Sequence, residues 1–241
     1  MRRRLRLLGT FLVAAGVLAL VWTVVVWRWQ DPFTALYTHW EQGKLSRSLE
    51  RQFESYRAPR IPQSLAVAGE ERVVARAALA YRRAARRGQA IGRIVVPRLG
   101  LNMAVVNGTD HDSLTKGPGR YLGSAMPGQN RLVYIAGHRT TYLAPFSAID
   151  HMRKGDRVTI RMPYATFVYA VTGYRIVRSD DLAVLHSPHH ELLELQACHP
   201  RFFATHRYIV YALPVRVMPA RGRPYDPRRP LAEAATEGAS G

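Results

Sequence analysis

An uncharged stretch from Leu7 to Trp27 is the feature that most constrains how this chain can fold. About 20 helical residues, at ~1.5 Å each, cover the ~30 Å hydrocarbon core of a bilayer. A cleaved signal peptide instead has an apolar core of about 7–15 residues, followed by small residues at the cleavage site. Here the apolar stretch is longer and ends among Trp22, Trp27 and Trp29, whose rings favour the membrane interface. Residues 1–30 are therefore predicted to form an uncleaved transmembrane anchor.

Charge predicts the orientation of this anchor. Four arginines lie between residues 2 and 6, whereas only Arg28 lies close to the other end of the apolar stretch. Because positive flanks stay in the cytoplasm, we expect a single-pass protein of the cell membrane, with a cytoplasmic N-terminus and an extracytoplasmic remainder. The chain carries 35 Lys and Arg against 17 Asp and Glu, a formal net charge of +18. This excess predicts attraction to anionic lipid, wall polymer or nucleic acid without choosing among them.

Residues 31–89 are predicted to form a helical stalk or linker that holds a domain off the membrane. Asp31-Pro32 ends the membrane helix, and a polar helix is expected over Ser46 to Tyr56. A second helix, rich in Ala and Arg, is expected from Glu70 to Arg87. Four of its residues share one face at helical spacing: Val74, Ala77, Ala78 and Tyr81. This basic helix could lie on anionic lipid, or it could be a solvated helix with no binding role.

Short β-rich runs, separated by Gly, Pro, Asn and Asp, fill residues 90–217. The runs cover residues 91–96, 101–106, 132–136, 158–162, 166–177, 192–198 and 208–217. This pattern predicts an all-β barrel or sandwich with only short helices, for example near Pro145 to Met152. Residues 218–241 are rich in Pro, Arg, Gly and Ala and are predicted to form a disordered tail.

The chain has one cysteine, Cys198, which excludes an internal disulfide and any multi-cysteine zinc or iron–sulfur site. Cys198 closes one predicted strand and Arg207 opens the next, so antiparallel pairing would place both at one rim of the barrel. His138 likewise follows an apolar strand. Spacing alone does not choose between it and the histidines near the cysteine, which are His186, His189, His190, His199 and His206. A thiolate, an imidazole and a guanidinium are the groups that acyl transfer through a thioester requires.

An ordered set of segments resembles the class E sortases, which are membrane-anchored cysteine transpeptidases of high-GC Gram-positive bacteria. The segments are GRIVVPRLGL (92–101), GPGRY (117–121), MPGQN (126–130), AGHRTTY (136–142) and CHP (198–200), followed by Arg207. They span the whole predicted β domain. The resemblance implies an all-β fold, a closed sortase-type β-barrel with short helices, over residues 90–217.

The resemblance also implies the site and the reaction. The family's catalytic cysteine, histidine and arginine fall on Cys198, His138 and Arg207. Tyr121 matches a tyrosine associated with substrate binding and with the sorting signal LAXTG instead of LPXTG. The implied partners are LAXTG-bearing secreted precursor proteins, a lipid-linked peptidoglycan precursor as amine acceptor, and the membrane, with no nucleic acid. The implied chemistry needs no metal and no organic cofactor.

The sequence departs from the family pattern beside the nucleophile. The usual TLxTC strand motif is ELQAC here, over residues 194–198, so Ala197 replaces the threonine before the cysteine. We expect Ala197 to lie in the substrate-binding site and to alter substrate preference or rate. Leu143 also stands where glycine is frequent in class E.

Other functions fit parts of the pattern. A peptidoglycan L,D-transpeptidase also uses Cys and His in an extracytoplasmic β domain. A non-enzymatic, membrane-tethered protein could bind anionic wall polymer through its arginines. A nucleic-acid binder is disfavoured, because the domain is predicted to be extracytoplasmic and lacks an aromatic-basic strand pattern. A pilin-polymerising sortase is a variant of the main interpretation, disfavoured because no covering lid segment is evident.

Overall fold

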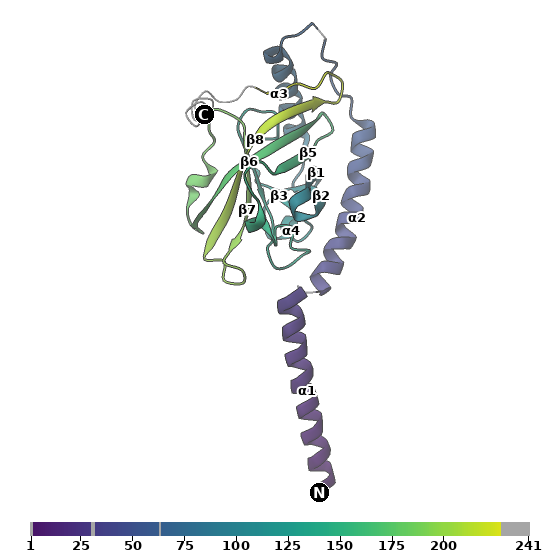
Figure 1. Ribbon diagram of the computed structural model, residues 1–241. Coiled ribbons are helices and arrows are strands. Elements are labelled where there is room, and N and C mark those ends of the chain that lie inside the picture. The colour runs from purple at the N-terminus through teal and green to yellow at the C-terminus, as the bar shows by residue number, and fades with distance from the viewer. Residues whose placement is uncertain (1, 30–31, 63, 228–241) are drawn as a thin grey trace.

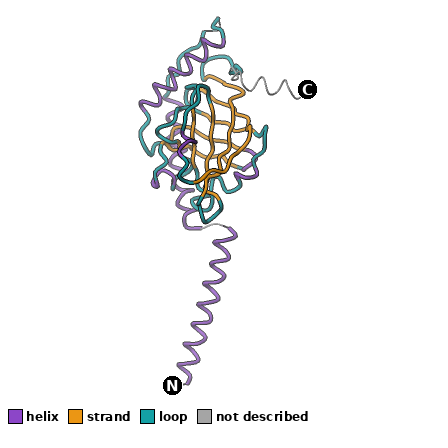
Figure 2. Tube along the Cα trace, turned by 90° about the vertical axis from the view of Figure 1, so that its left-hand side faces the viewer, coloured by secondary structure: helices purple, strands orange, loops and turns teal. Residues whose placement is uncertain are grey.

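The protein, seen here as a computed structural model, is built around one closed β-barrel (Figure 1, Figure 2). The structure describes residues 2–29, 32–62 and 64–227. The strands are β1 (Ala90–Val96), β2 (Leu101–Asn107), β3 (Gly119–Arg120), β4 (Leu132–Ala136), β5 (Arg157–Arg161), β6 (Ala165–Arg178), β7 (Leu192–His199) and β8 (His206–Pro219). Their order around the barrel is β1-β2-β3-β4-β7-β8-β6-β5. The predicted all-β barrel is confirmed, and closure leaves no free sheet edge.

Two parallel contacts interrupt an otherwise antiparallel barrel. β2 pairs with β3 in parallel, and so does β4 with β7, whereas the other neighbouring strands are antiparallel. The connections between strands carry only short helices, as expected. They are η1 (Pro97–Leu99), α4 (His111–Leu114), η2 (Ile149–His151) and η3 (Leu182–Leu185).

Side chains alternate between the two faces of the barrel wall, and this alternation positions the site. Leu193, Leu195 and Ala197 of β7 are buried in the main hydrophobic core. Since successive strand residues point to opposite faces, Glu194 and Cys198 belong to the outer face. The nucleophile predicted from the sequence is therefore not part of the core.

Two helices before the barrel, in the segment predicted to form a helical stalk or linker, pack directly against it. They are α2 (Pro32–Ser55) and α3 (Val67–Ala84). Leu45 and Leu49 of α2 are buried in a small cluster with residues of β1 and β2. Val74 and Ala78 of α3 join the main core. The apolar face predicted for α3 is confirmed, but its partner is the barrel.

The helix α1 (Arg2–Trp29) extends away from the barrel (Figure 1). Its segment Arg2–Val25 is the one candidate membrane span among the described residues, by length and composition, and none of its apolar window is buried in the protein. This agrees with the length and composition of the predicted anchor.

The ordered chain continues beyond the predicted start of the tail at residue 218. β8 runs to Pro219, and Tyr225 pairs with Val217 through backbone hydrogen bonds of 2.8 and 2.9 Å. The Tyr225 side chain is buried in the main core. The remaining part of the predicted tail, residues 228–241, lies outside the described residues.

Candidate active site

Cys198 and Arg207 are direct cross-strand neighbours on the antiparallel pair β7–β8. Directly opposed residues of such a pair have Cα atoms about 4.5–5.5 Å apart, and their side chains lie on the same face. Both side chains are half-buried. Arg207 Nη1 donates to the carbonyl oxygens of Ala204 at 2.7 Å and His206 at 3.0 Å. These bonds hold the guanidinium at the base of the β7–β8 connection, beside the thiol.

His138 reaches the same end of the barrel from β4. The parallel register of β4 and β7 pairs Ala136 with Gln196, and the Gly137 amide donates to the Gln196 carbonyl at 3.0 Å. Two residues further along each chain are His138 and Cys198. The thiol on β7, the guanidinium on β8 and the imidazole just after β4 therefore lie at the same end of three neighbouring strands.

The loop after His138 has an unusual backbone geometry and places an aromatic ring beside the imidazole. Tyr142, Leu143 and Ala144 have positive φ angles of 53°, 60° and 37°. Such left-handed conformations cost a non-glycine residue about 1–2 kcal/mol each, which accounts for a glycine being favoured where Leu143 stands. The Phe146 amide donates to the His138 carbonyl at 3.1 Å, and the ring of Tyr142 lies 5.0 Å from the His138 ring.

Burial and charge both act on the His138 imidazole. Its Nε2 is buried and has no hydrogen-bond partner among the described residues. Desolvation lowers the pKa of His138, and the positive charge of His111 lowers it further. A neutral imidazole with an uncommitted ring nitrogen can take up and release a proton during a reaction.

The side chains of His138 and His199, two candidates for the histidine of the site, lie in different surroundings. Because His199 follows Cys198 in β7, its side chain points to the opposite face of the strand. Its Nδ1 lies 2.9 Å from Nη1 of Arg139, a buried arginine that also pairs with Asp150 at 2.6 Å. His199 thus belongs to a buried polar cluster on the other side of the barrel wall.

Tyr121 lies over an apolar surface on the outer face that carries Cys198. Its ring packs edge-on against Tyr134 at 6.2 Å, and its amide donates to the Tyr134 carbonyl at 2.9 Å. A small apolar cluster surrounds this pair and comprises Leu114, Leu132, Ala136, Val184, Leu185 and Leu192. The predicted substrate-binding tyrosine is therefore placed on the face along which a peptide could approach Cys198.

The side chain of Ala197, which the sequence predicts to lie in the substrate-binding site, lies inside the barrel. Its side chain is fully buried in the main core beside Leu195 and does not share the outer face with Cys198. The reason is the two-residue period of the strand, which turns the residue before the nucleophile inward. Ala197 can influence a bound peptide only indirectly, through the packing of β7.

Sequence reasoning did not assign a role to Glu194, which the structure buries on the outer face. It is paired with Tyr134 on β4 and with Tyr211 on β8. Its Oε2 has no hydrogen-bond partner among the described residues, and desolvation raises its pKa to about 8. A carboxyl group in such surroundings is neutral over most of the physiological pH range. In the sequence, a charged residue between the apolar Leu193 and Leu195 indicated this buried carboxyl group.

We expect Glu194→Gln to stabilise the protein at high pH. The folded-state pKa of Glu194 is raised above its ordinary value, so the carboxyl costs stability as pH rises from about 4.5 through about 8. Glutamine cannot ionise, and the gain in unfolding free energy should be on the order of 5 kcal/mol at pH 9 and below about 1 kcal/mol at pH 5. Thermal unfolding at the two pH values measures it, with the exposed Glu50→Gln as control. A gain independent of pH would contradict the prediction.

A cavity of about 350 Å³ lies at the opposite end of the barrel from Cys198. It is lined by residues that precede β4 and β7, among them Asn130 and Glu191, and by Tyr225. Glu191 accepts hydrogen bonds from Tyr169 at 2.6 Å and from the Gly128 amide at 2.7 Å. Its carboxylate is thus already satisfied within the fold. Within the described ranges, no group of three or more His, Cys, Asp or Glu residues could hold a metal ion.

A thiol beside a guanidinium, with an imidazole at the end of the adjoining strand, gives this barrel the groups of a cysteine-dependent acyl-transfer enzyme. The sortase domain family matches residues 94–215, which contain all three groups. The chain therefore belongs to the sortase family.

Individual relatives agree with this assignment. The chain is 34% identical over 128 residues to Sortase D of Bacillus subtilis, a match that covers 52% of this chain and 63% of that protein. The structure of sortase E from Streptomyces avermitilis is similar with a TM-score of 0.50 and 31% identity, over 56% of this chain and 93% of that chain. The Clostridium perfringens sortase D5 transpeptidase shares the fold, with a TM-score of 0.58 and 22% identity over 73% of this chain and 98% of that chain.

Proposed function

We propose that this protein is a membrane-anchored class E transpeptidase that joins secreted proteins to the cell wall. The observation that carries the proposal is the cross-strand pair of Cys198 and Arg207, with His138 at the end of the strand paired to β7. Its substrate would be a precursor protein with a C-terminal LAXTG-like signal, cleaved between Thr and Gly. The acceptor would be an amine of a lipid-linked peptidoglycan precursor.

The arrangement of the side chains supports a two-step reaction. Cys198 first gives its thiol proton to the neutral His138 imidazole, which forms a thiolate and an imidazolium. The thiolate attacks the Thr–Gly carbonyl carbon, and Arg207 donates hydrogen bonds to the resulting oxyanion. Collapse of this tetrahedral intermediate breaks the C–N bond and leaves a thioester on Cys198. His138 gives its proton to the departing glycine amine. The acceptor amine then attacks the thioester, His138 takes up its proton, and the thiolate leaves. No residue outside the three is needed to balance protons.

The helix α1 supports a reaction at the outer surface of the cell membrane. A single-pass anchor with a cytoplasmic N-terminus would place the barrel outside the membrane, where a tethered precursor and a lipid-linked acceptor share the same surface. Confinement to one surface raises the effective concentration of all three components. Membership of the sortase family argues against an L,D-transpeptidase or a non-enzymatic wall-polymer binder.

The direct test detects the thioester. The full-length chain in detergent micelles is incubated with LAXTG and LPXTG peptides, with and without triglycine, and analysed by mass spectrometry. The full chain is required because α2 and α3 contribute to the barrel's packing. We expect an acyl adduct on Cys198 that disappears when triglycine is added, with release of a peptide–triglycine product. Absence of the adduct with either peptide would refute the proposal.

We expect Tyr121→Ala to change the choice between LAXTG and LPXTG. Tyr121 packs on Tyr134 at the outer face, where its ring can limit the space for the second residue of the signal. Loss of the ring should lower the ratio of kcat/KM values for LAXTG over LPXTG by roughly 10-fold, the scale of one apolar contact. Competition between the two peptides measures the ratio, and Tyr174→Ala, an exposed tyrosine on β6, is the control. A uniform loss on both peptides would contradict a role in specificity.

A further inference from the structure

The first turns of α2 expose apolar side chains, although the helix is firmly attached to the barrel. Leu36 is 71% exposed and Trp40 is 56% exposed, and Tyr37 lies beside them. Beyond Trp40 the exposed residues of α2 are charged, as at Lys44 and Glu50, apart from Ser55 at its end. The outward surface of one helix thus changes from apolar to charged along its length. Neighbouring exposed apolar side chains of this kind are typical of a surface that contacts a membrane or another protein.

Hydrogen bonds fix the direction in which this apolar surface points. On the opposite side of α2, Thr38 donates to the Thr115 carbonyl at 2.8 Å. Gln42 donates to the carbonyls of Lys116 at 2.7 Å and Ala104 at 3.1 Å, and it accepts from the Ala104 amide at 2.7 Å. These contacts prevent α2 from rotating about its axis, so the apolar side chains of its first turns stay exposed.

The β7–β8 connection exposes two more aromatic rings beside the candidate active site. Phe202 is 58% and Phe203 is 77% exposed. The connection is held at its base, where Arg201 donates to the Ser147 carbonyl at 2.9 Å and the Ala204 amide donates to the Pro200 carbonyl at 3.1 Å. The two rings therefore project from a loop whose base is anchored.

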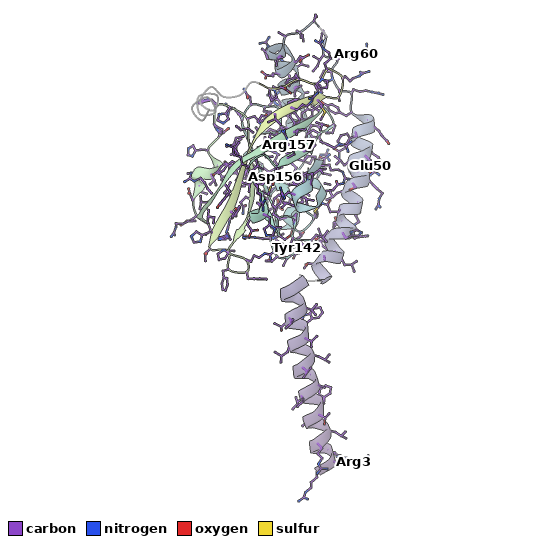
Figure 3. The ribbon with its side chains drawn as sticks, in the orientation of Figure 1. Arg3, Glu50, Arg60, Tyr142, Asp156 and Arg157 are labelled. Atoms are coloured by element: carbon purple, nitrogen blue, oxygen red, sulfur yellow. The ribbon has the colours of Figure 1, made fainter. Side chains whose placement is uncertain are left out.

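Both apolar surfaces lie at the end of the barrel that faces α1. In Figure 1 the β7–β8 connection and the start of α2 both lie at the end nearest α1. Figure 3 labels Tyr142, from the loop after His138, at this end and Arg60 at the opposite end. The Tyr142 amide donates to Thr34 Oγ1 at 3.2 Å, so the catalytic loop contacts the chain five residues after the end of α1 at Trp29.

We propose that this end of the protein docks on the bilayer, with the first turns of α2 and the tip of the β7–β8 connection inserted into the interface. The inference rests on the proposed membrane anchor, because α1 brings this end to the membrane. Aromatic and aliphatic side chains flanked by cations favour the interface between headgroups and acyl chains. Arg201 provides such a cation, and so does Lys44, whose ammonium lies over the Trp40 ring and also pairs with Glu41 at 3.0 Å.

Docking would hold the mouth of the active site against the membrane surface. Cys198 and Arg207 lie at the base of the connection that carries Phe202 and Phe203. A precursor tethered by its own hydrophobic segment, or a lipid-linked acceptor, would then meet the thiol without leaving the interface. The bilayer itself becomes one wall of the substrate site.

Spin labelling measures the depth of each surface. In the full-length chain, Cys198→Ala removes the one cysteine, and single cysteines are introduced by Phe203→Cys, Trp40→Cys or Arg60→Cys. Each protein is labelled with a nitroxide and reconstituted in vesicles of phosphatidylcholine and phosphatidylglycerol. We expect collisions with a water-soluble nickel chelate to be several-fold lower at the first two sites than at Arg60, with more collisions with oxygen. Equal chelate accessibility at Phe203 and Arg60 would overturn the proposal.

Turnover provides a second readout. Phe202→Ser with Phe203→Ser should lower cleavage of a lipid-anchored LAXTG peptide several-fold and leave cleavage of the soluble peptide unchanged. An equal loss on both substrates would assign the loop to peptide binding and overturn membrane docking. The depth measurement uses an inactive protein, so it can succeed even if the proposed transpeptidase activity fails, and the two failures are distinguishable.

Discussion

Cys198→Ala is expected to abolish cleavage of the sorting peptide and formation of any acyl adduct. The thiol is the one sulfur nucleophile that the sequence offers, and it is half-buried on the outer face of β7 opposite Arg207. Alanine fits the same space but cannot form a thioester, so the reaction has no covalent route left. Peptide cleavage followed by chromatography, together with intact-protein mass spectrometry, measures both losses.

The outcome is informative because the substitution should not disturb the fold. Cys198 contributes nothing to the main core, which β7 builds from Leu193, Leu195 and Ala197. The melting temperature of Cys198→Ala should therefore stay close to that of the parent chain. Iodoacetamide should inactivate the parent by modifying one site, since there is one cysteine. Product formation by Cys198→Ala at the parent's rate would disprove the assigned nucleophile.

Strand patterns in the sequence predicted most of the barrel, because burial on one face leaves a visible period of two. All seven predicted β runs correspond to strands, and β4 matches its predicted bounds of Leu132 to Ala136. The two-residue strand β3 was missed, since Gly119 and Arg120 carry no apolar pattern. Its pairing depends on β2 and β4, which lie on either side of it in the barrel.

The location of the site was also predictable, but its details were not. Cys198 and Arg207 at adjoining strand ends implied a pair, and the register confirms that they are direct neighbours. Ala197 lies at an even spacing from the apolar Leu193 and Leu195, so the alternation of strand side chains places all three on the inward face. The packing of α2 could not be foreseen, because its contacts with β1 and β2 join residues that lie far apart in the chain.

We expect His138→Gln to lower kcat/KM by roughly 10²–10⁴-fold, the usual contribution of a general acid–base group. Glutamine keeps a polar side chain beside Tyr142 but cannot transfer a proton. The matched control is His199→Gln on the next strand, whose ring faces Arg139 and the opposite side of β7. It should retain far more activity than His138→Gln. A larger loss in His199→Gln would transfer the proton-carrying role to His199.

The pH profile distinguishes proton transfer from a merely structural role. The pKa of His138 is lowered by burial and by the charge of His111, so its protonated fraction falls at a lower pH than for an ordinary histidine. Protonation of the leaving amine therefore weakens as pH rises through this lowered pKa. His111→Gln removes the neighbouring positive charge, raises the pKa of His138, and should move the alkaline limb of kcat/KM to higher pH. The pKa of His138 measured by NMR titration should rise as well. If this pKa rises but the alkaline limb of kcat/KM does not move, His138 does not carry out the rate-determining proton transfer.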